Sequence, residues 1–311
     1  MKRFITLLAG VVASFALLAT PAGAITGNFV DDTEHPWIGL VAFYDVDPAT
    51  GEETFLWRCS ASALTDRVVL TAGHCTEQDV PAGADSPDLA RIWFHQNVGG
   101  AFNPPTVPED PNTGYPNRCL PGDPLCVEAT LLFDFGFNDF AGFPNTHDAG
   151  LIILPASDPI VLPEYGQLAE AGYLDPLITQ RGRQDVTFTV TGYGVSLTNP
   201  TRTVSFRERL MAATTLVNLN SAQNGGFNIQ LSSAPASGRG GTCFGDSGGP
   251  VLIGGFTSNT IVAVNSFVLN QNCRGVGFGF RTDTQAVINW ILATVAANAP
   301  SEVSDIDFVE R

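Results

Sequence analysis

The chain has 311 residues, and its 31 Asp and Glu outnumber its 15 Lys and Arg, which gives a formal net charge of −16. Such an acidic balance argues against nucleic acid or an anionic membrane as the partner, and it fits a solvated surface that keeps the protein in solution. A chain of this length can bury the core of one large domain or two smaller units without help from disulfides.

Residues 1–24 have the order of a secretory signal peptide. Lys2 and Arg3 precede an apolar run, and a segment of small residues follows it and ends at Ala24. A membrane anchor is the alternative, but the run is shorter than the roughly 20 residues of a spanning helix, and Pro21 interrupts its end. We therefore expect cleavage after Ala24 and a secreted, extracellular protein.

Most of the remaining chain has the pattern of β-structure. The 32 Gly and 21 Pro of the full chain, nearly all of them after residue 24, separate short runs of β-branched and aromatic residues, such as those at 68–70 and 186–190. No internal repeat is visible, and the pattern favours a β-sandwich or β-barrel over a helical fold. Residues 78–143 are rich in Pro, Gly, Asn and Asp, which predicts extended surface loops.

One helix is predicted near the C-terminus. Apolar residues recur at helical spacing over 283–297, and Thr282 or Asp283 is a candidate N-cap. Residues 298–311 are acidic and weakly apolar, which predicts a mobile tail.

The chain contains six cysteines. An even number in an exported protein predicts three disulfides, and sequence alone leaves 15 possible pairings. Metal binding is the alternative, but neither a CxxC nor an HExxH spacing occurs, so we expect no metal.

The segment from Gly245 to Pro250 reads Gly-Asp-Ser-Gly-Gly-Pro, with Ser247 between glycines. Glycines allow a tight turn that exposes a serine nucleophile and directs backbone amides at a developing oxyanion. An ordinary turn is the alternative, because such sequences are common in turns. The motif therefore needs support from the rest of the chain.

The order of the candidate catalytic residues separates the serine hydrolase classes. The G-x-S-x-G elbow of α/β-hydrolases requires a histidine after the serine. The four histidines all precede Ser247: His35, His74, His95 and His147. The subtilisin order would require a distinguishable acid before His74, and none stands out there.

Two segments supply the order histidine, aspartate, serine. His74 follows an apolar run and lies beside Cys75, which could fix its position by a disulfide. Asp148 precedes the apolar run 149–154, where a buried carboxylate needs a hydrogen-bonding partner. A histidine base would supply that partner.

In this chain the three segments read Thr-Ala-Gly-His-Cys, His-Asp-Ala-Gly-Leu and Gly-Asp-Ser-Gly-Gly-Pro. They resemble the chymotrypsin/trypsin-like serine peptidase family, whose motifs are Thr-Ala-Ala-His-Cys, Asp-Ile-Ala-Leu-Leu and Gly-Asp-Ser-Gly-Gly-Pro. The resemblance extends from Ile25, which looks like the mature amino terminus, to the C-terminal helix. It implies an all-β fold of two packed antiparallel barrels with a C-terminal helix. The peptidase domain would cover residues 25–297, with the junction between barrels at about 155–185 and an acidic tail at 298–311.

The resemblance also implies roles. Ser247 would be the nucleophile, His74 the general base and then general acid, and Asp148 the group that orients His74. The backbone amides of Gly245 and Ser247 would form the oxyanion hole, and Ser266 would support Asp148. The resemblance thus implies a serine endopeptidase that hydrolyses proteins or peptides through an acyl-enzyme intermediate. It would be a monomer, would need no cofactor, and could be bound by protein inhibitors.

Cysteine pairs follow from the same resemblance. Cys59 would pair with Cys75, and Cys243 would pair with Cys273 beside the specificity pocket. Cys119 and Cys126 would then form the third bridge.

Activation and specificity are further expectations from the resemblance. A new amino terminus at Ile25 would pair with Asp246, so signal cleavage itself would activate the enzyme unless a short extension remains. Gly241, Val268 and Gly277 would line an uncharged pocket for apolar or medium-sized side chains. The alternative function is a non-catalytic binding protein on the same fold.

Overall fold

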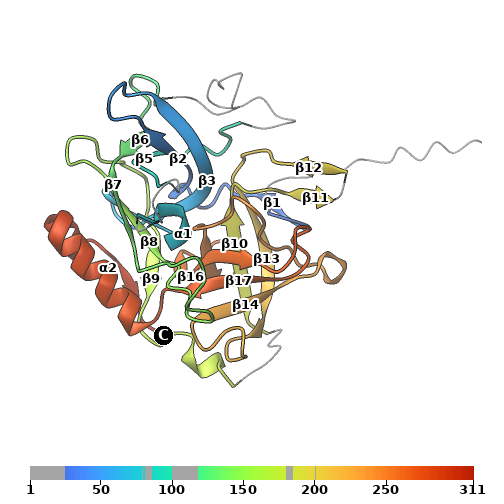
Figure 1. Ribbon diagram of the computed structural model, residues 1–311. Helices are drawn as coiled ribbons and strands as arrows, with labels where there is room; N and C mark the ends of the chain where they lie inside the picture. Colours follow the sequence, from blue (N-terminus) through green and yellow to red (C-terminus); the bar gives the residue numbers. More distant parts are fainter. Residues whose placement is uncertain (1–24, 79, 81–85, 100–117, 180–184, 200) are drawn as a thin grey trace, which may run out of the picture.

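The computed structural model describes residues 25–78, 80, 86–99, 118–179, 185–199 and 201–311 (Figure 1). The expected signal peptide at 1–24 lies outside the described residues. Figure 1 shows two curved sheets that lie beside each other, with one long helix next to the first sheet.

The first sheet has seven strands in the order β6-β5-β2-β3-β4-β8-β7, and every neighbouring pair is antiparallel. Its strands are β2 (Ile38–Val46), β3 (Glu53–Ala63), β4 (Val68–Thr71), β5 (Leu89–Trp93), β6 (Cys126–Ala129), β7 (Leu131–Asp134) and β8 (Gly150–Ile153).

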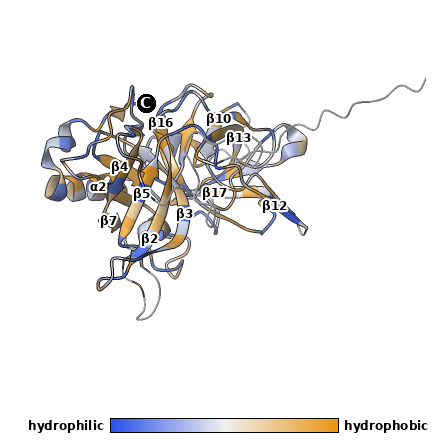
Figure 2. Cartoon of the chain, turned by 90° about the horizontal axis from the view of Figure 1, so that it is seen from above, coloured by the Kyte–Doolittle hydropathy of each residue, from blue (hydrophilic) through white to orange (hydrophobic). Residues whose placement is uncertain are grey.

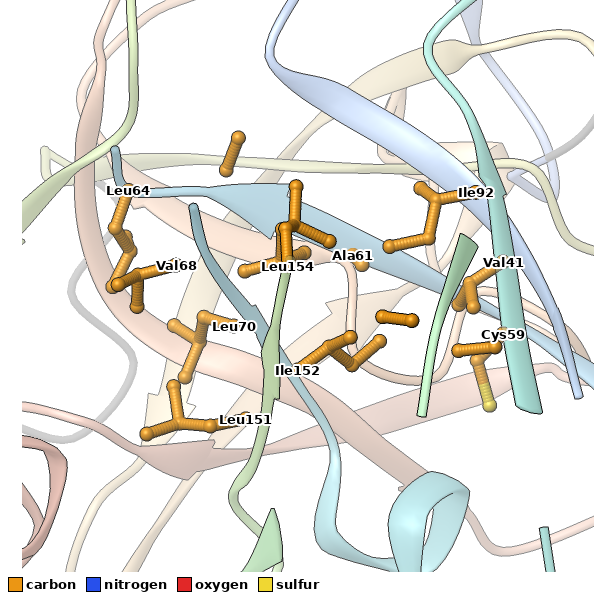
Figure 3. Packing of buried hydrophobic residues seen from close by; sticks show 14 of the residues in the cluster. Val41, Cys59, Ala61, Leu64, Val68, Leu70, Ile92, Leu151, Ile152 and Leu154 are labelled. Carbon is orange, nitrogen blue, oxygen red and sulfur yellow. The ribbon is translucent and has the colours of Figure 1, made fainter. Parts of the chain in front are cut away.

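Close packing of apolar side chains holds the first sheet in its curved form. Figure 3 shows side chains from β2, β3, β4, β5 and β8 pointing into one cluster, with Val41, Ala61 and Ile152 among them. Each of these three is fully buried. Branched side chains that fit a pleated, buried surface therefore explain why these short runs form strands.

The second sheet has nine strands, with β15-β10-β13-β14-β17-β16 as its central path and β15 also paired with β16. That last pairing closes the path into a ring. The ring strands are β10 (Thr187–Gly192), β13 (Leu210–Asn218), β14 (Asn228–Ser233), β15 (Pro250–Ile253), β16 (Thr260–Val268) and β17 (Gly275–Arg281).

Three short strands extend this ring. β1 (Val30–Asp31) pairs with β13, and β9 (Gln167–Ala169) runs parallel to both β16 and β18 (Phe308–Val309). A separate ribbon joins β11 (Leu197–Asn199) to β12 (Arg202–Val204). Figure 2 shows hydrophobic residues concentrated along the strands of both sheets and hydrophilic residues in many of the turns.

The described residues contain few helices. They are α1 (Gly73–Thr76), α2 (Gln285–Asn298) and three short 3₁₀ segments, η1 (Asp175–Leu177), η2 (Pro235–Ser237) and η3 (Pro300–Ser304). The predicted fold class, all-β with two antiparallel barrels and a C-terminal helix, is confirmed. No described helix is long and apolar enough to cross a bilayer.

The prediction of loops throughout residues 78–143 is wrong. Strands β5, β6 and β7 lie in this range; β6 and β5 form one edge of the first sheet and β7 forms the opposite edge. All five residues of β5 are buried, including Arg91, whose guanidinium contacts Glu53 and Glu128 at 3.0 Å and 2.6 Å. The strands were hidden because they are short and lie between turn-rich segments.

The prediction of a mobile tail at 298–311 is also wrong. Helix α2 ends at Asn298, η3 follows, and β18 joins the second sheet. Glu302 is buried at 5% exposure, and its carboxylate accepts a hydrogen bond from Thr65 Oγ1 at 2.9 Å. The acidic composition suggested a solvated segment, but this contact satisfies the buried acid.

Two segments, the start of the described chain at Ile25 and helix α2, cross to the other sheet. Ile25 packs in the core of the second sheet, although the chain then enters the first sheet at β2. In the opposite direction, α2 follows β17 of the second sheet but buries Val287, Ile291 and Val295 in the core of the first. These crossings, together with the buried Arg209, connect the two barrels.

Arg209 makes several polar contacts between the sheets. It is 4% exposed, and its Nη1 donates to the carbonyls of Ile38 and Phe94 at 3.0 and 3.2 Å. Its Nε donates to the Asp32 carbonyl at 3.1 Å. A buried guanidinium with this many acceptors fixes the relative position of the elements that supply the site.

Candidate active site

Ser247 lies in a tight turn that leads into β15. Ser60 in β3 donates its N–H to the Ser247 carbonyl at 2.7 Å, and Gly248 donates to the Asn265 carbonyl in β16 at 2.8 Å. Gly245 and Gly248 have φ values of +92° and +78°, in the left-handed region that glycine tolerates best. The turn is thus fixed by both neighbouring barrels.

Gly248 also allows a close approach of the backbones. A Cβ there would lie 2.1 Å from Thr71 Oγ1 and 2.5 Å from the Ser60 carbonyl oxygen. The glycine after Ser247 is therefore required by space as well as by backbone conformation.

His74 and Asp148 are brought together by paired strands. His74 lies in α1 directly after β4, Asp148 lies shortly before β8, and β4 pairs with β8 so that Thr71 faces Gly150. A Cβ on Gly150 would lie 2.5 Å from the Ala72 carbonyl oxygen. The absence of a side chain at Gly150 thus permits α1 to lie against β8.

The Asp148 carboxylate binds both the ring and the backbone of His74. His74 Nδ1 lies 3.0 Å from each Asp148 carboxylate oxygen, and the His74 backbone N–H donates to Oδ1 at 2.8 Å. Ser266 Oγ, from β16, donates to Asp148 Oδ2. Asp148 is fully buried, so these contacts are what make its charge tolerable.

The pairing shifts both pKa values. Burial by itself would raise the pKa of Asp148, but the charge and hydrogen bonds of His74 and the Ser266 hydroxyl hold it below its usual value. Burial opposes protonation of His74, but the Asp148 charge and hydrogen bond raise its pKa above the usual value. The pair therefore favours an ionised Asp148 and stabilises a protonated His74.

Ser247 and His74 line the same cleft, which has a volume of about 740 Å³. His74 binds Asp148 through Nδ1, so Nε2 is the nitrogen available to the cleft. In the described part of the chain no hydrogen bond joins Ser247 Oγ to this nitrogen. Such contacts often tighten only when substrate binds.

The amides of Gly245 and Ser247 have no protein acceptor among the described residues, whereas Asp246, Gly248 and Gly249 donate theirs within the turn or to β16. Two amides without acceptors on one glycine-bracketed turn match the requirement for oxyanion donors. The geometry thus groups both expected donors beside Ser247.

Aromatic side chains form one wall of the cleft. Phe137 contacts the His74 ring at a centroid distance of 5.8 Å, and Phe140 contacts Phe137 at 5.1 Å and Phe267 at 5.6 Å. Sequence reasoning missed Phe137 and Phe140, which lie between β7 and β8. Arg58 and Phe244, also in the cleft lining, belong to no motif that would have singled them out.

The three expected pocket residues do not line one space. Val268 lines the large cleft, whereas Gly241 and Gly277 line a separate cavity of about 10 Å³.

Ile25 and Asp246 are both fully buried. Thr26, next to Ile25, exchanges two backbone hydrogen bonds with Gly241 at 2.8 and 2.9 Å. Asp246 accepts hydrogen bonds from the N–H groups of Gly194 and Cys243, both at 2.8 Å. Burial nevertheless raises the pKa of Asp246 to about 7.

The structure forms three disulfides: Cys59–Cys75, Cys119–Cys126 and Cys243–Cys273. These are the pairs that the resemblance implied. Cys59, Cys75 and His74 bring potential metal-ligand atoms within 4.8 Å of one another. Both sulfurs are in a disulfide, so they offer no thiolate to a metal ion.

Comparison with known proteins tests the family resemblance. Residues 173–291 match the family model described as Trypsin, a range that contains Ser247 and most of the second sheet. This part of the chain is therefore similar to trypsin. A comparison with curated proteins gave no significant match.

Solved structures show the same fold. HL collagenase is 16% identical, has a TM-score of 0.54, and its match covers 88% of this chain and 98% of the collagenase chain. An inactivated protease paralogue of the scabies mite, S-D1, is 17% identical with a TM-score of 0.55, and its match covers 87% of this chain and 97% of its own. The trypsin-like fold therefore extends over both barrels.

Proposed function

We propose that this trypsin-like protein is a secreted serine endopeptidase. The observation that carries the proposal is the pairing of His74 with a buried Asp148 in the cleft that also contains Ser247. Serine peptidases of this family act on proteins or peptides, so the proposed substrates are proteins or peptides. The proposed reaction needs no nucleic acid, membrane or cofactor. After loss of the signal peptide at 1–24, the enzyme would comprise the predicted domain of residues 25–297 together with η3 and β18, which pack against it.

The arrangement accounts for each chemical step. Ser247 Oγ attacks the peptide carbonyl while His74 Nε2 takes its proton, and Asp148 stabilises the imidazolium that forms. The amides of Gly245 and Ser247 donate to the oxyanion of the tetrahedral intermediate. His74 then protonates the leaving amine, and water attacks the acyl-enzyme by the same route to release the product.

The inactivated scabies mite paralogue shows that a protein on this fold can be a protease paralogue without activity. A non-catalytic binding protein is therefore the second candidate. In the described part of this chain, Ser247 and His74 line one cleft, the buried Asp148 binds His74, and the amides of Gly245 and Ser247 have no protein acceptor. Those features favour catalysis.

The proposal is tested by labelling the secreted protein with a fluorophosphonate, with Ser247→Ala as the control. Labelling at Ser247 that the control loses, together with cleavage of a mixed peptide library, would support the endopeptidase. Folded protein that starts at Ile25 and neither labels nor cleaves would favour the binding protein instead.

We further propose that export activates the enzyme. Cleavage after Ala24 would create an ammonium on Ile25, and its pairing with Asp246 would relieve the cost of burying that carboxylate. The burial of both residues and the docking of Thr26 on Gly241 support this proposal. Sequencing the amino terminus of the active secreted protein tests it, and any start other than Ile25 would contradict it.

A further inference from the structure

A small cavity beside the cleft is bounded by three adjacent strands. β14 pairs with β17 and β17 with β16, so that Leu231, Gly277 and Val268 face one another across the sheet. Ser233 lies two residues beyond Leu231, and side chains two apart on a strand share a face. The side chains of Ser233 and Val268 can therefore reach the space over Gly277.

Distances measured from Gly277 show how full that space is. A Cβ placed on Gly277 would lie 2.9 Å from Thr242 Oγ1, 3.6 Å from Ser233 Oγ and 4.0 Å from Val268 Cγ1. Three side chains from three segments thus converge on one point. The absence of a side chain at Gly277 does not leave an open pocket.

Gly241 is closed in the same way. A Cβ on Gly241 would lie 1.8 Å from Ser233 Oγ and 2.4 Å from Ser233 Cβ. Ser233 therefore occupies the volume into which a side chain at position 241 would project. Its hydroxyl is buried and has no hydrogen-bond partner within the described residues.

The remaining space behind the cleft is the size of a single water. The cavity that Ser233, Gly241 and Gly277 line has a volume of about 10 Å³, against about 740 Å³ for the cleft. A cavity needs roughly 10–15 Å³ to hold one water. Thr242 and Asn265 line both spaces and mark the boundary between them.

The wall of this region is also filled. The rings of Phe267 and Phe278 stack at a centroid distance of 4.4 Å with planes 7° apart. No charged residue lines the small cavity in the described part of the chain. A long or cationic side chain would therefore meet neither space nor a carboxylate there.

We propose that the enzyme cleaves after small, uncharged residues such as alanine and serine, with Ser233 and Val268 as the residues that set this limit. The inference rests on the proposed endopeptidase function and narrows the pocket expected from the sequence, which would have accepted medium-sized side chains. A side chain of one or two heavy atoms ends before it reaches the convergence of Thr242, Ser233 and Val268. A leucine, phenylalanine or arginine would have to displace them.

The test is kcat/KM for a series of peptide amides that differ only in the residue before the scissile bond. We expect alanine and serine to exceed leucine, phenylalanine and arginine by at least tenfold, since a few methylenes in a restrictive pocket are worth about 10–200-fold. The wild-type series alone decides the proposal, so it does not depend on the folding of a variant.

Variants then assign the limit to the two residues. Ser233→Gly combined with Val268→Gly should raise kcat/KM for phenylalanine relative to alanine at least tenfold. Ser232→Gly is the matched control, because Ser232 is adjacent on β14 and lines neither space. An unchanged ratio in the double variant that still labels at Ser247 would refute the assignment.

The experiments distinguish an error in the inferred pocket specificity from an error in the proposed endopeptidase function. Labelling of Ser247 with equally fast cleavage after phenylalanine, leucine or arginine would overturn the pocket inference and leave the endopeptidase intact. The absence of both labelling and cleavage would overturn the proposed function and the inference with it.

Discussion

Replacing Gly248 with alanine tests how tightly the turn of Ser247 is positioned. The left-handed backbone at Gly248 costs an alanine roughly 1–2 kcal/mol. The added Cβ would lie 2.1 Å from Thr71 Oγ1 and 2.5 Å from the Ser60 carbonyl oxygen, which are joined by a hydrogen bond of 2.9 Å. Separating them loses that bond and the one from Gly248 to Asn265, each worth about 1 kcal/mol.

The free energy of unfolding should therefore fall by about 3–4 kcal/mol, which at roughly 2–4 °C for each kcal/mol lowers the melting temperature by about 6–16 °C. Displacement of the adjacent Ser247 amide should also reduce kcat on the order of 10²-fold, the effect of losing one oxyanion donor. Calorimetry and peptide hydrolysis below the melting transition measure the two effects separately.

Gly255→Ala is the control, because no atom lies within 4 Å of a Cβ there. Its change in stability should stay within about 0.5 kcal/mol, as for other surface substitutions. If Gly248→Ala has the same melting temperature and the same kcat as Gly255→Ala, the argument that Thr71 and Ser60 fix the turn is refuted.

Two other predictions concern the charge pair and the C-terminus. Catalysis needs neutral His74, and Asp148 raises the pKa of His74, so kcat/KM should fall as the pH drops through that raised pKa. Asp148→Asn should move this acid limb to lower pH and reduce kcat by about 10⁴-fold; an unmoved limb in a pH profile would contradict the pairing. Deleting residues 300–311 removes the buried Glu302 and Ile306 and should lower the melting temperature without shifting the acid limb. An unchanged melting curve would show that this segment contributes nothing to stability.

The family resemblance was accessible from sequence because its signals are short and local. Ser247, His74 and Asp148 each lie in a run of five or six residues whose composition reflects tight turns and buried strand ends. Their residue types and chain order together identified a catalytic class. The cysteine pairs could be named only through the resemblance, since spacing alone allowed many pairings.

What sequence could not predict depends on distant contacts. Ser233 lies in no motif, and its importance arises only because β14, β17 and β16 are neighbours. Likewise, Phe137 and Phe140 become part of the cleft only through their contacts with His74 and Phe267. The acidic composition of the C-terminal segment also led us to expect Glu302 to be exposed to solvent. In the structure its carboxylate is instead buried and accepts a hydrogen bond from Thr65.

The crossing of the two terminal segments should affect how well the protein resists proteolysis. Because Ile25 is part of the second core and α2 is part of the first, neither barrel can open without losing a segment that belongs to the other. The free energy needed to open one barrel then approaches the free energy of global unfolding. The peptidase proposed above would be secreted among its own copies and cleaved by them through such open states, so this interlock should protect it from self-digestion.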